Sequence, residues 1–248
     1  MPLYIQTDFT PNAVRPVECL SEGWELIKDQ YWIFCGISLV AILIGNLAPL
    51  GILMAPMMCG IYLAIFRRMR SERVEFDALF KGFDYFGESM IALMLHLIPV
   101  VAVIIPFVGI FFFTSILMVP HSPDAEPSPS GMVGFLIVVL IISLVLVFTM
   151  IVIGVMFTFA YPLIVERKLS GVEAVKLSMK AGKANFWGLL GLLLLNALLG
   201  VMGVLLCYVG VFLVLPISFA ATACAYRNVF GLGQVQSPYP PPPPGTFV

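Results

Sequence analysis

The chain has 248 residues, of which 60% are hydrophobic and only 11% are charged, and its mean hydropathy is +1.04. Soluble globular proteins carry roughly 25% charged residues, so this composition excludes a soluble enzyme, a disordered protein and a secreted disulfide scaffold. A net charge of −1 with a pI near 6.1 offers no field that neutralises phosphates, which also excludes a nucleic-acid-binding protein. The class that remains is an all-α, polytopic membrane protein.

Long stretches without charge locate the predicted membrane crossings. Asp, Glu, Lys and Arg are absent from residues 31–66, 89–123, 127–165 and 185–226. Because a spanning helix needs about 20 apolar residues to cross about 30 Å of hydrocarbon, we divide the first and last stretches into two crossings each. The predicted spans are residues 32–48, 50–66, 89–118, 132–163, 187–206 and 208–226.

The third predicted span is long, and we expect one helix bent at Pro99 and Pro106. An eight-span alternative splits this stretch and the fourth one, but its pieces of about 15 residues fall below the usual spanning length. The embedded polar residues are expected to form hydrogen bonds between helices in most cases. They are Asn46, Asn196, Thr114, Ser115, Ser143, Thr149, Thr158, Ser218 and Thr222.

The basic residues predict the orientation of the six spans. All 13 Lys and Arg residues precede span one, lie between spans two and three or between spans four and five, or follow span six. These segments share one side of the membrane, and short loops rich in Lys and Arg stay in the cytoplasm. We therefore expect a cytoplasmic N-terminal arm (1–15), a six-helix membrane domain (16–231) and a proline-rich cytoplasmic tail (232–248).

The segment before each odd-numbered span carries apolar residues at steps of three and four. They are Val17, Leu20, Trp24, Ile27 and Tyr31 in the first segment, Phe76, Leu79, Phe83 and Phe86 in the second, and Val172, Val175 and Met179 in the third. This spacing predicts three amphipathic helices that lie at the membrane interface. Ser170 and Glu173 have the spacing of a capping box at the start of the third.

The helices that return to the cytoplasm also resemble one another. Pro56 lies eleven residues before Arg67, and Pro216 lies eleven residues before Arg227. We interpret the chain as three copies of one unit, an interfacial amphipathic helix followed by a transmembrane hairpin. The alternative is that any helix leaving a membrane ends with an aromatic and then a basic residue, which accounts less well for the matched proline spacing.

Two stretches of the chain resemble a family of bacterial six-helix membrane proteins typified by YciC. They are residues 161–178 (YPLIVERKLSGVEAVKLS) and 183–188 (KANFWG), and residues 23–28 and 225–231 fit the same pattern. The chain is also similar to the membrane domains fused to some glycerophosphodiester phosphodiesterases. The resemblance covers roughly residues 16–231 and implies a fold and a location in the bacterial cytoplasmic (inner) membrane, rather than an activity.

The embedded stretches hold little that catalysis could use. Acid–base or metal chemistry needs several converging titratable groups, and these stretches offer only His96, which is more often a core residue than a relay. We therefore expect no enzyme activity, no cofactor and no metal site. One functional hypothesis is a permease for an apolar or amphiphilic small molecule, with a candidate pathway at His96, Pro99 and Pro106.

The cytoplasmic face favours another hypothesis, in which a non-enzymatic membrane protein organises lipids or partner proteins at the inner leaflet. Basic residues near an anionic leaflet contribute about 1 kcal/mol each. The candidate headgroup contacts are Arg67, Arg68, Arg70, Arg73, Lys176, Lys180 and Lys183. The alternative is that these residues only anchor the topology.

The C-terminal tail is the candidate site for a protein partner. Its proline run consists of Pro240, Pro241, Pro242, Pro243 and Pro244. Polyproline forms an extended left-handed helix that aromatic grooves bind at low entropic cost. A tail without a partner is the alternative interpretation, and the sequence leaves the oligomeric state open.

Overall fold

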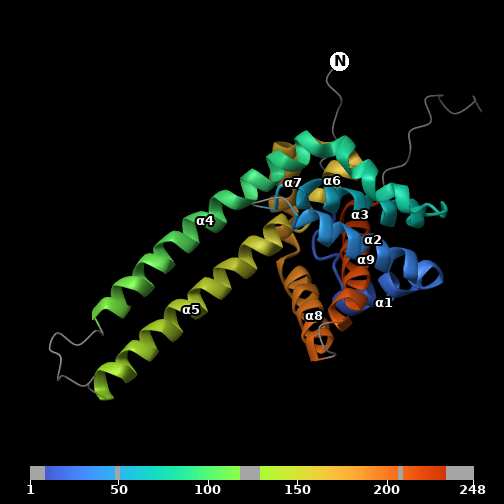
Figure 1. Cartoon of the computed structure of the whole chain (residues 1–248). Coiled ribbons are helices and arrows are strands. Elements are labelled where there is room, and N and C mark those ends of the chain that lie inside the picture. The colour runs from blue at the N-terminus through green and yellow to red at the C-terminus, as the bar shows by residue number, and fades with distance from the viewer. Residues whose placement is uncertain (1–8, 48–50, 118–128, 206–208, 233–248) are drawn as a thin grey trace, which may run out of the picture.

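The computed structural model describes residues 9–47, 51–117, 129–205 and 209–232, and the regular elements in these ranges are helices (Figure 1). In chain order they are α1 (Pro16–Ile27), the short 3₁₀-helix η1 (Lys28–Gln30), α2 (Tyr31–Gly45), α3 (Met54–Met69), the 3₁₀-helix η3 (Phe76–Tyr85), α4 (Phe86–Leu117), α5 (Pro129–Phe157), α6 (Ala160–Arg167), α7 (Gly171–Ala184), α8 (Phe186–Leu205) and α9 (Val209–Phe230). The prediction of an all-α protein is confirmed.

Five helical stretches in the described ranges are long and apolar enough to cross a membrane. They are Pro16–Gly45, Phe76–Ile116, Met132–Arg167, Phe186–Leu205 and Gly210–Phe230. The chain is a helical membrane protein. Helix α3 lies where the second span is predicted, but its 16 residues measure about 24 Å along the axis, which is short of the hydrocarbon thickness.

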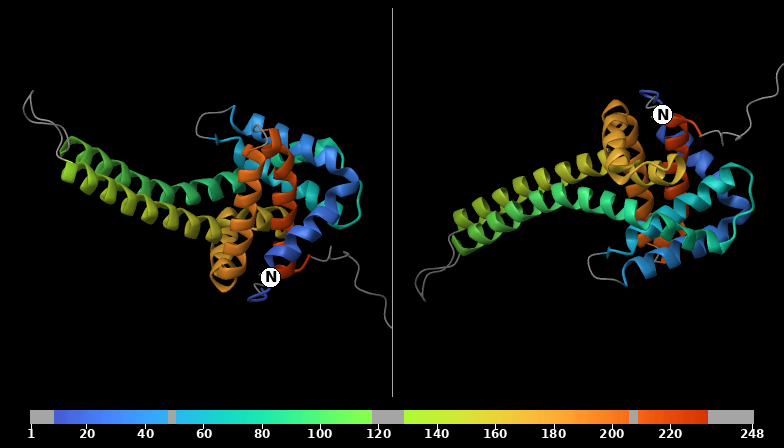
Figure 2. Two further views of the ribbon diagram at one scale, coloured as in Figure 1. Left: turned by 90° about the horizontal axis from the view of Figure 1, so that it is seen from below. Right: turned by 90° about the horizontal axis from the view of Figure 1, so that it is seen from above.

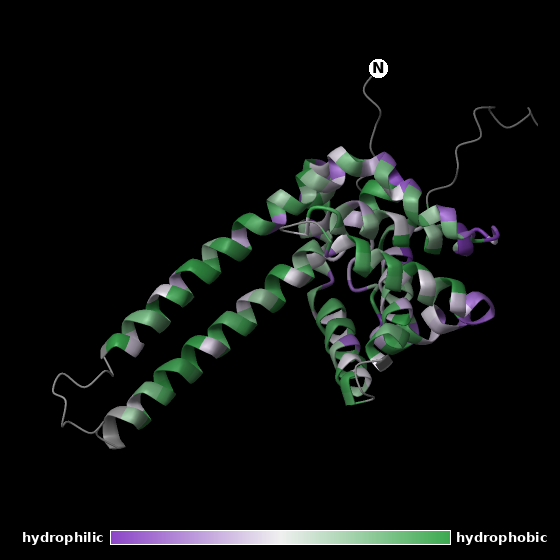
Figure 3. Ribbon diagram, in the orientation of Figure 1, coloured by the Kyte–Doolittle hydropathy of each residue, from purple (hydrophilic) through white to green (hydrophobic). Residues whose placement is uncertain are grey.

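Helices α4 and α5 lie side by side and reach away from the cluster formed by the other helices (Figures 1 and 2). Both are hydrophobic on all sides, as Figure 3 shows, and large side chains such as Ile98 and Phe148 are 65% exposed. A helix that is apolar all round and unburied in its own protein is expected to face lipid.

The prolines affect these two helices differently. Helix α4 continues through Pro99 and Pro106. The predicted fourth span, 132–163, is interrupted, because α5 ends at Phe157 and α6 begins at Ala160. Two features coincide at the break: Pro162 cannot donate to the carbonyl of Thr158, and the Ser178 hydroxyl of α7 accepts from Phe159 N and donates to Met156 O.

Each of the three segments that the sequence predicts to be interfacial packs on a helix with a basic residue in its last turn, and these contacts link the described helices into a closed ring. Segment η3 lies on α3, α7 lies on α5 and α6, and α1 lies on α9 at the other end of the chain. Each contact contains a glycine whose missing side chain lets two backbones approach. A Cβ atom would lie 2.2 Å from Pro56 O at Gly82, 2.7 Å from Ala221 N at Gly23 and 3.0 Å from Val155 O at Gly182.

Larger apolar residues such as Leu79 and Val175 are buried in these segments, but one buried row in each segment consists mostly of small residues. Its positions lie four, eight and twelve residues before the start of α2, α4 and α8. They are Cys19, Gly23 and Ile27 in the first segment, Val74, Ala78 and Gly82 in the second, and Ala174, Ser178 and Gly182 in the third. Most residues of the predicted apolar faces are exposed, as expected of helices whose apolar face contacts lipid, and they include Val17, Trp24, Phe76, Phe83 and Met179; Ile27, Leu79 and Val175 are buried.

The N-terminal arm completes the ring between the first and third units. Asn185, buried between α7 and α8, accepts a hydrogen bond from Ala13 N at 2.8 Å and donates to Thr10 O at 3.2 Å. Thr10 N in turn donates to Val229 O of α9 at 2.8 Å. The arm is therefore held by backbone and amide hydrogen bonds to the last unit. Ser170 is the N-cap of α7, because its side chain accepts from Glu173 N, while its hydroxyl donates to the Glu173 carboxylate; the N-cap half of the predicted capping box is confirmed.

Candidate functional site

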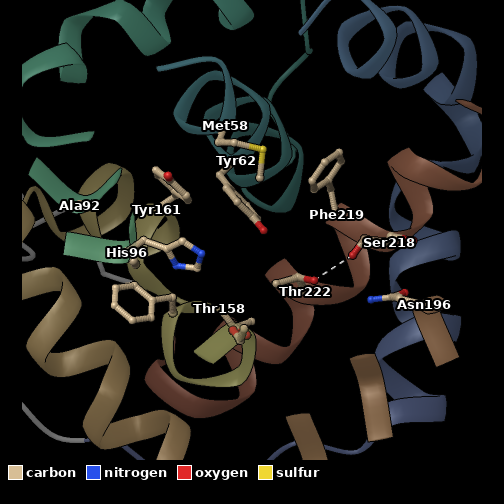
Figure 4. Close-up of a pocket in the computed structure, with 13 residues that line it drawn as sticks. Met58, Tyr62, Ala92, His96, Thr158, Tyr161, Asn196, Ser218, Phe219 and Thr222 are labelled. Atoms are coloured by element: carbon tan, nitrogen blue, oxygen red, sulfur yellow. Dashed lines mark hydrogen bonds between the residues drawn. The ribbon is translucent and has the colours of Figure 1, made fainter. Parts of the chain in front are cut away.

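The helices that end the three units, α3, α5–α6 and α9, surround a cavity of about 330 Å³, which we call the axial cavity (Figure 4). Each helix contributes a residue at an equivalent position, nine residues before the basic residue near its end. The pairs are Met58 and Arg67, Thr158 and Arg167, and Ser218 and Arg227. The axial cavity therefore lies where these three helices meet.

Uncharged polar side chains lie among mainly apolar surface in the wall of the axial cavity. Tyr62, Tyr161 and Thr222 lie about one turn nearer the basic helix ends, and α4 and α8 add His96 and Asn196. None of the described residues that line the cavity is Asp, Glu, Lys or Arg. His96 is held by an edge-to-face contact with Phe157, with ring centres 4.6 Å apart.

Asn196 has an unmet hydrogen-bonding need. Its Oδ1 atom is buried and has no hydrogen-bond partner, and Figure 4 shows its amide nitrogen turned toward Ser218 and Thr222. Those two hydroxyls donate within their own helix, Ser218 to Val214 O and Thr222 to Ser218 O. The amide is therefore available to a group that enters the cavity.

An aromatic cluster and an ion pair close the axial cavity at the end that carries the basic residues. The ring centres of Phe66 and Tyr226 are 5.3 Å apart, and those of Phe159 and Tyr226 are 6.0 Å apart. Beside them Arg70 donates to both carboxylate oxygens of Glu166 at 2.7 Å, and the Glu166 side chain is only 1% exposed. These residues join α3, α6 and α9 above the cavity.

Helix α8 contributes less to the cavity wall than the other helices do, because Asn196 is the one described residue of α8 that lines it. Helices α5 and α8 approach at Gly154 and Leu193, where a Cβ at Gly154 would lie 3.6 Å from Leu193 Cδ1. Beyond that contact α8 and the hairpin of α4 and α5 diverge, as Figures 1 and 2 both show. His96, Thr158 and Asn196 are only half-buried, which is consistent with access from the side between α5 and α8.

A second cavity, of about 370 Å³, lies between α4, α5 and α7, and we call it the lateral groove. Its apolar walls include Leu95, Pro99, Val152, Met156, Val175 and Met179. Lys176 is the charged residue among the described residues that line it. Lys180 and Lys183 follow Lys176 at steps of four and three, so a stripe of exposed lysines runs along α7 beside the groove.

The arginines predicted to contact headgroups are mostly engaged within the protein. Arg68 binds Asp29 at 2.7 Å and also donates to Leu26 O, Arg70 binds Glu166, and Arg67 lies 4.0 Å from Asp77. These pairs join the end of α3 to η3, η1 and α6. By contrast, the other four candidates are exposed and form no ion pair within the described residues; they are Arg73, Lys176, Lys180 and Lys183.

The structure does not bring the three predicted pathway residues together. His96 lines the axial cavity, Pro99 lines the lateral groove, and Pro106 is exposed and lines neither. The tail with Pro240–Pro244 lies outside the described residues. The sequence analysis found His96 but missed the tyrosines of the axial cavity, which lie on helices far apart in the chain.

The expectation that most embedded polar residues bond between helices is wrong for many of them. A Ser or Thr hydroxyl on a helix reaches the carbonyl one turn earlier, and this is what the structure shows. The residues concerned are Thr114, Ser115, Thr149, Thr158, Ser218 and Thr222.

Comparisons of the chain with protein-family models, curated proteins and solved structures find no match.

Proposed function

We propose that this protein is a non-enzymatic, six-crossing protein of the bacterial cytoplasmic membrane, with both termini in the cytoplasm, that binds anionic phospholipids of the inner leaflet. The observation that carries this proposal is the position of Lys176 at an apolar groove between α4, α5 and α7. The groove offers hydrocarbon contact to one acyl chain, and the lysine stripe offers charge to a phosphate.

The six-crossing arrangement is supported by the basic residues and by the repeated packing of the three units. Helix α3 ends with Arg67 and Arg68, like the outgoing helices of the other two units, which also end at basic residues. A helix shorter than the bilayer can still span it when the bilayer thins or flanking residues reach the interface. The resemblance to the family typified by YciC agrees with this threading, and we propose membership of that family.

Electrostatics favours an anionic headgroup at this place. Lys176, Lys180 and Lys183 have flexible stems that lie along apolar surface while the ammonium groups reach the headgroup layer. Each lysine near an anionic leaflet contributes about 1 kcal/mol. The arginines on α3 contribute less to lipid binding, because Asp29, Asp77 and Glu166 already neutralise Arg68, Arg67 and Arg70.

Native mass spectrometry of the detergent-purified protein tests the proposal. The wild type is expected to retain phosphatidylglycerol in preference to phosphatidylcholine with the same acyl chains. Replacing two lysines in Lys176→Gln/Lys180→Gln removes about 2 kcal/mol, which is about 30-fold in affinity. The control, Lys81→Gln, removes one charge from η3, where Lys81 pairs with Asp77, and is expected to leave retention unchanged.

A groove-filling variant tests the acyl-chain contact separately. Val172 lines the groove and is 40% exposed, so Val172→Phe places a ring in the space proposed for the chain. It is expected to weaken retention of phosphatidylglycerol with all lysines in place. Equal retention of both lipids by the wild type would refute the proposal, as would a double lysine variant that binds like Lys81→Gln.

A further inference from the structure

We propose that the axial cavity binds the uncharged, hydroxyl-bearing head of a neutral lipid, such as a monoacylglycerol or diacylglycerol, which reaches it from the bilayer between α5 and α8. This site is separate from the lateral groove. It lies on the other side of α5, at the meeting point of α3, α5–α6 and α9 (Figure 4).

The absence of charge among the described lining residues selects a neutral head. An ionised group buried without a partner of opposite sign costs far more than a hydroxyl that finds hydrogen bonds. The nearest ion pair, Arg70 with Glu166, lies beyond the aromatic cluster, and each of its members already neutralises the other. A phosphate therefore has nothing to pair with in the axial cavity, in contrast to the lateral groove.

The lining polar groups match a hydroxyl in kind. Figure 4 shows the Asn196 amide nitrogen turned toward Ser218 and Thr222, so this group can donate to a ligand in the cavity. A hydroxyl donates one hydrogen bond and accepts others, so it can accept from the Asn196 amide and donate to the oxygen of Tyr62 or Tyr161. An ester can accept but has no donor, so it makes fewer of these hydrogen bonds, and a hydrocarbon group makes none.

The depth and the opening of the cavity fit a lipid that stays in the bilayer. Tyr62 lies five residues before Arg67, which corresponds to about 7.5 Å along a helix. This places the cavity just below the layer of basic side chains. The aromatic cluster of Phe66, Phe159 and Tyr226 blocks the basic end, so the acyl chain is directed sideways, where α5 and α8 diverge (Figure 2).

The test compares three single-chain probes with the purified protein by native mass spectrometry. These are 1-decanoylglycerol, methyl decanoate, which lacks the hydroxyl groups, and decanoyl lysophosphatidylglycerol, which adds a charge. The wild type is expected to bind 1-decanoylglycerol at least about tenfold more tightly than methyl decanoate. Asn196→Leu, which removes the amide at nearly constant volume, is expected to weaken binding of 1-decanoylglycerol about tenfold.

The control is Thr149→Val on α5, whose hydroxyl bonds to Val145 O outside the cavity, and it is expected to bind like the wild type. Phosphatidylglycerol retention is expected to stay at the wild-type level in both variants, which separates this site from the lateral groove. If Asn196→Leu loses both 1-decanoylglycerol and phosphatidylglycerol, His96→Phe is used as the cavity variant in its place. Equal binding of methyl decanoate and 1-decanoylglycerol, or undiminished binding by the cavity variants, would overturn the proposal.

Discussion

Substitution of Gly82 by Ala measures how tightly the interfacial segments are docked. A Cβ atom at this position would lie 2.2 Å from Pro56 O and 2.5 Å from Gly60 N, both backbone atoms of α3. Since Cβ contacts below 3.0 Å essentially never occur, η3 and α3 must separate by about 0.8 Å (3.0 − 2.2). Overpacking of this kind costs about 1–3 kcal/mol, and we expect the upper end because no flexible side chain can yield.

Thermal unfolding of the detergent-solubilised protein, followed by size-exclusion chromatography of heated samples, gives the magnitude. About 3 kcal/mol corresponds to a Tm lowered by roughly 6–12 °C for a chain of this size. The matched control is Gly87→Ala, five residues further on, where an added Cβ meets no atom within 4 Å. Gly87 lies in α4, so the control is expected to leave Tm unchanged or raise it slightly.

The same reasoning orders the equivalent glycines of the ring. Gly23→Ala, with a contact of 2.7 Å to Ala221 N, should lower Tm less than Gly82→Ala, and Gly182→Ala, at 3.0 Å, should lower it least. A Gly82→Ala variant that unfolds with the Tm of Gly87→Ala would refute the close docking of η3 on α3.

Three further outcomes are expected. Glu166→Gln should lower Tm by more than Asp77→Asn, because Glu166 is buried in a two-bond pair whereas Asp77 forms exposed pairs worth at most about 1 kcal/mol; equal shifts in thermal unfolding would contradict this. Asn185→Ala removes the amide that holds the N-terminal arm and should speed chymotryptic cleavage of the arm after Phe9, as gel electrophoresis of timed digests can show. An unchanged cleavage rate would mean that the remaining backbone bonds suffice. In intact cells, an impermeant thiol reagent should label Ser128→Cys and not Arg73→Cys; the reverse pattern would invert the proposed topology.

The sequence predicted the positions of the helices well, because the formation of a helix depends mainly on residues that are neighbours in the chain. The charge-free stretches located the apolar helices, and the spacing of Ser170 and Glu173 located the start of α7. The break between α5 and α6 was not expected. Pro99 and Pro106 leave α4 continuous while Pro162 coincides with an interruption, so proline alone did not distinguish the two outcomes.

Apolar periodicity located the exposed apolar faces of these segments but only part of their packing faces, since Ile27, Leu79 and Val175 are buried. In water, burial favours the largest apolar side chains, but lipid solvates those side chains as well as a protein core does, so close backbone approach decides the contacts. Gly23, Gly82 and Gly182 therefore face the protein while Trp24 and Phe83 face outward. A search for small residues at steps of four would have found this face.

The axial cavity could not be predicted from the sequence, since it depends on how α3, α4, α6, α8 and α9 pack together. His96 was recognised as a lone polar residue, whereas Tyr62 and Tyr161 resembled ordinary interfacial aromatics. The matched positions of Met58, Thr158 and Ser218, nine residues before a basic helix end, were a usable signal once the repeat had been aligned on those ends.

The contact between α1 and α9 has a consequence for how the protein is made. Helix α1 leaves the ribosome early, but the surface that covers Cys19 and Gly23 is synthesised some two hundred residues later. At the synthesis rate of about 5–20 residues per second, the first amphipathic helix waits for at least ten seconds or so without its permanent neighbour. During that interval lipid, or a membrane chaperone, must cover the face of α1 that carries Cys19 and Gly23. The helical bundle is complete only after α9 has been synthesised.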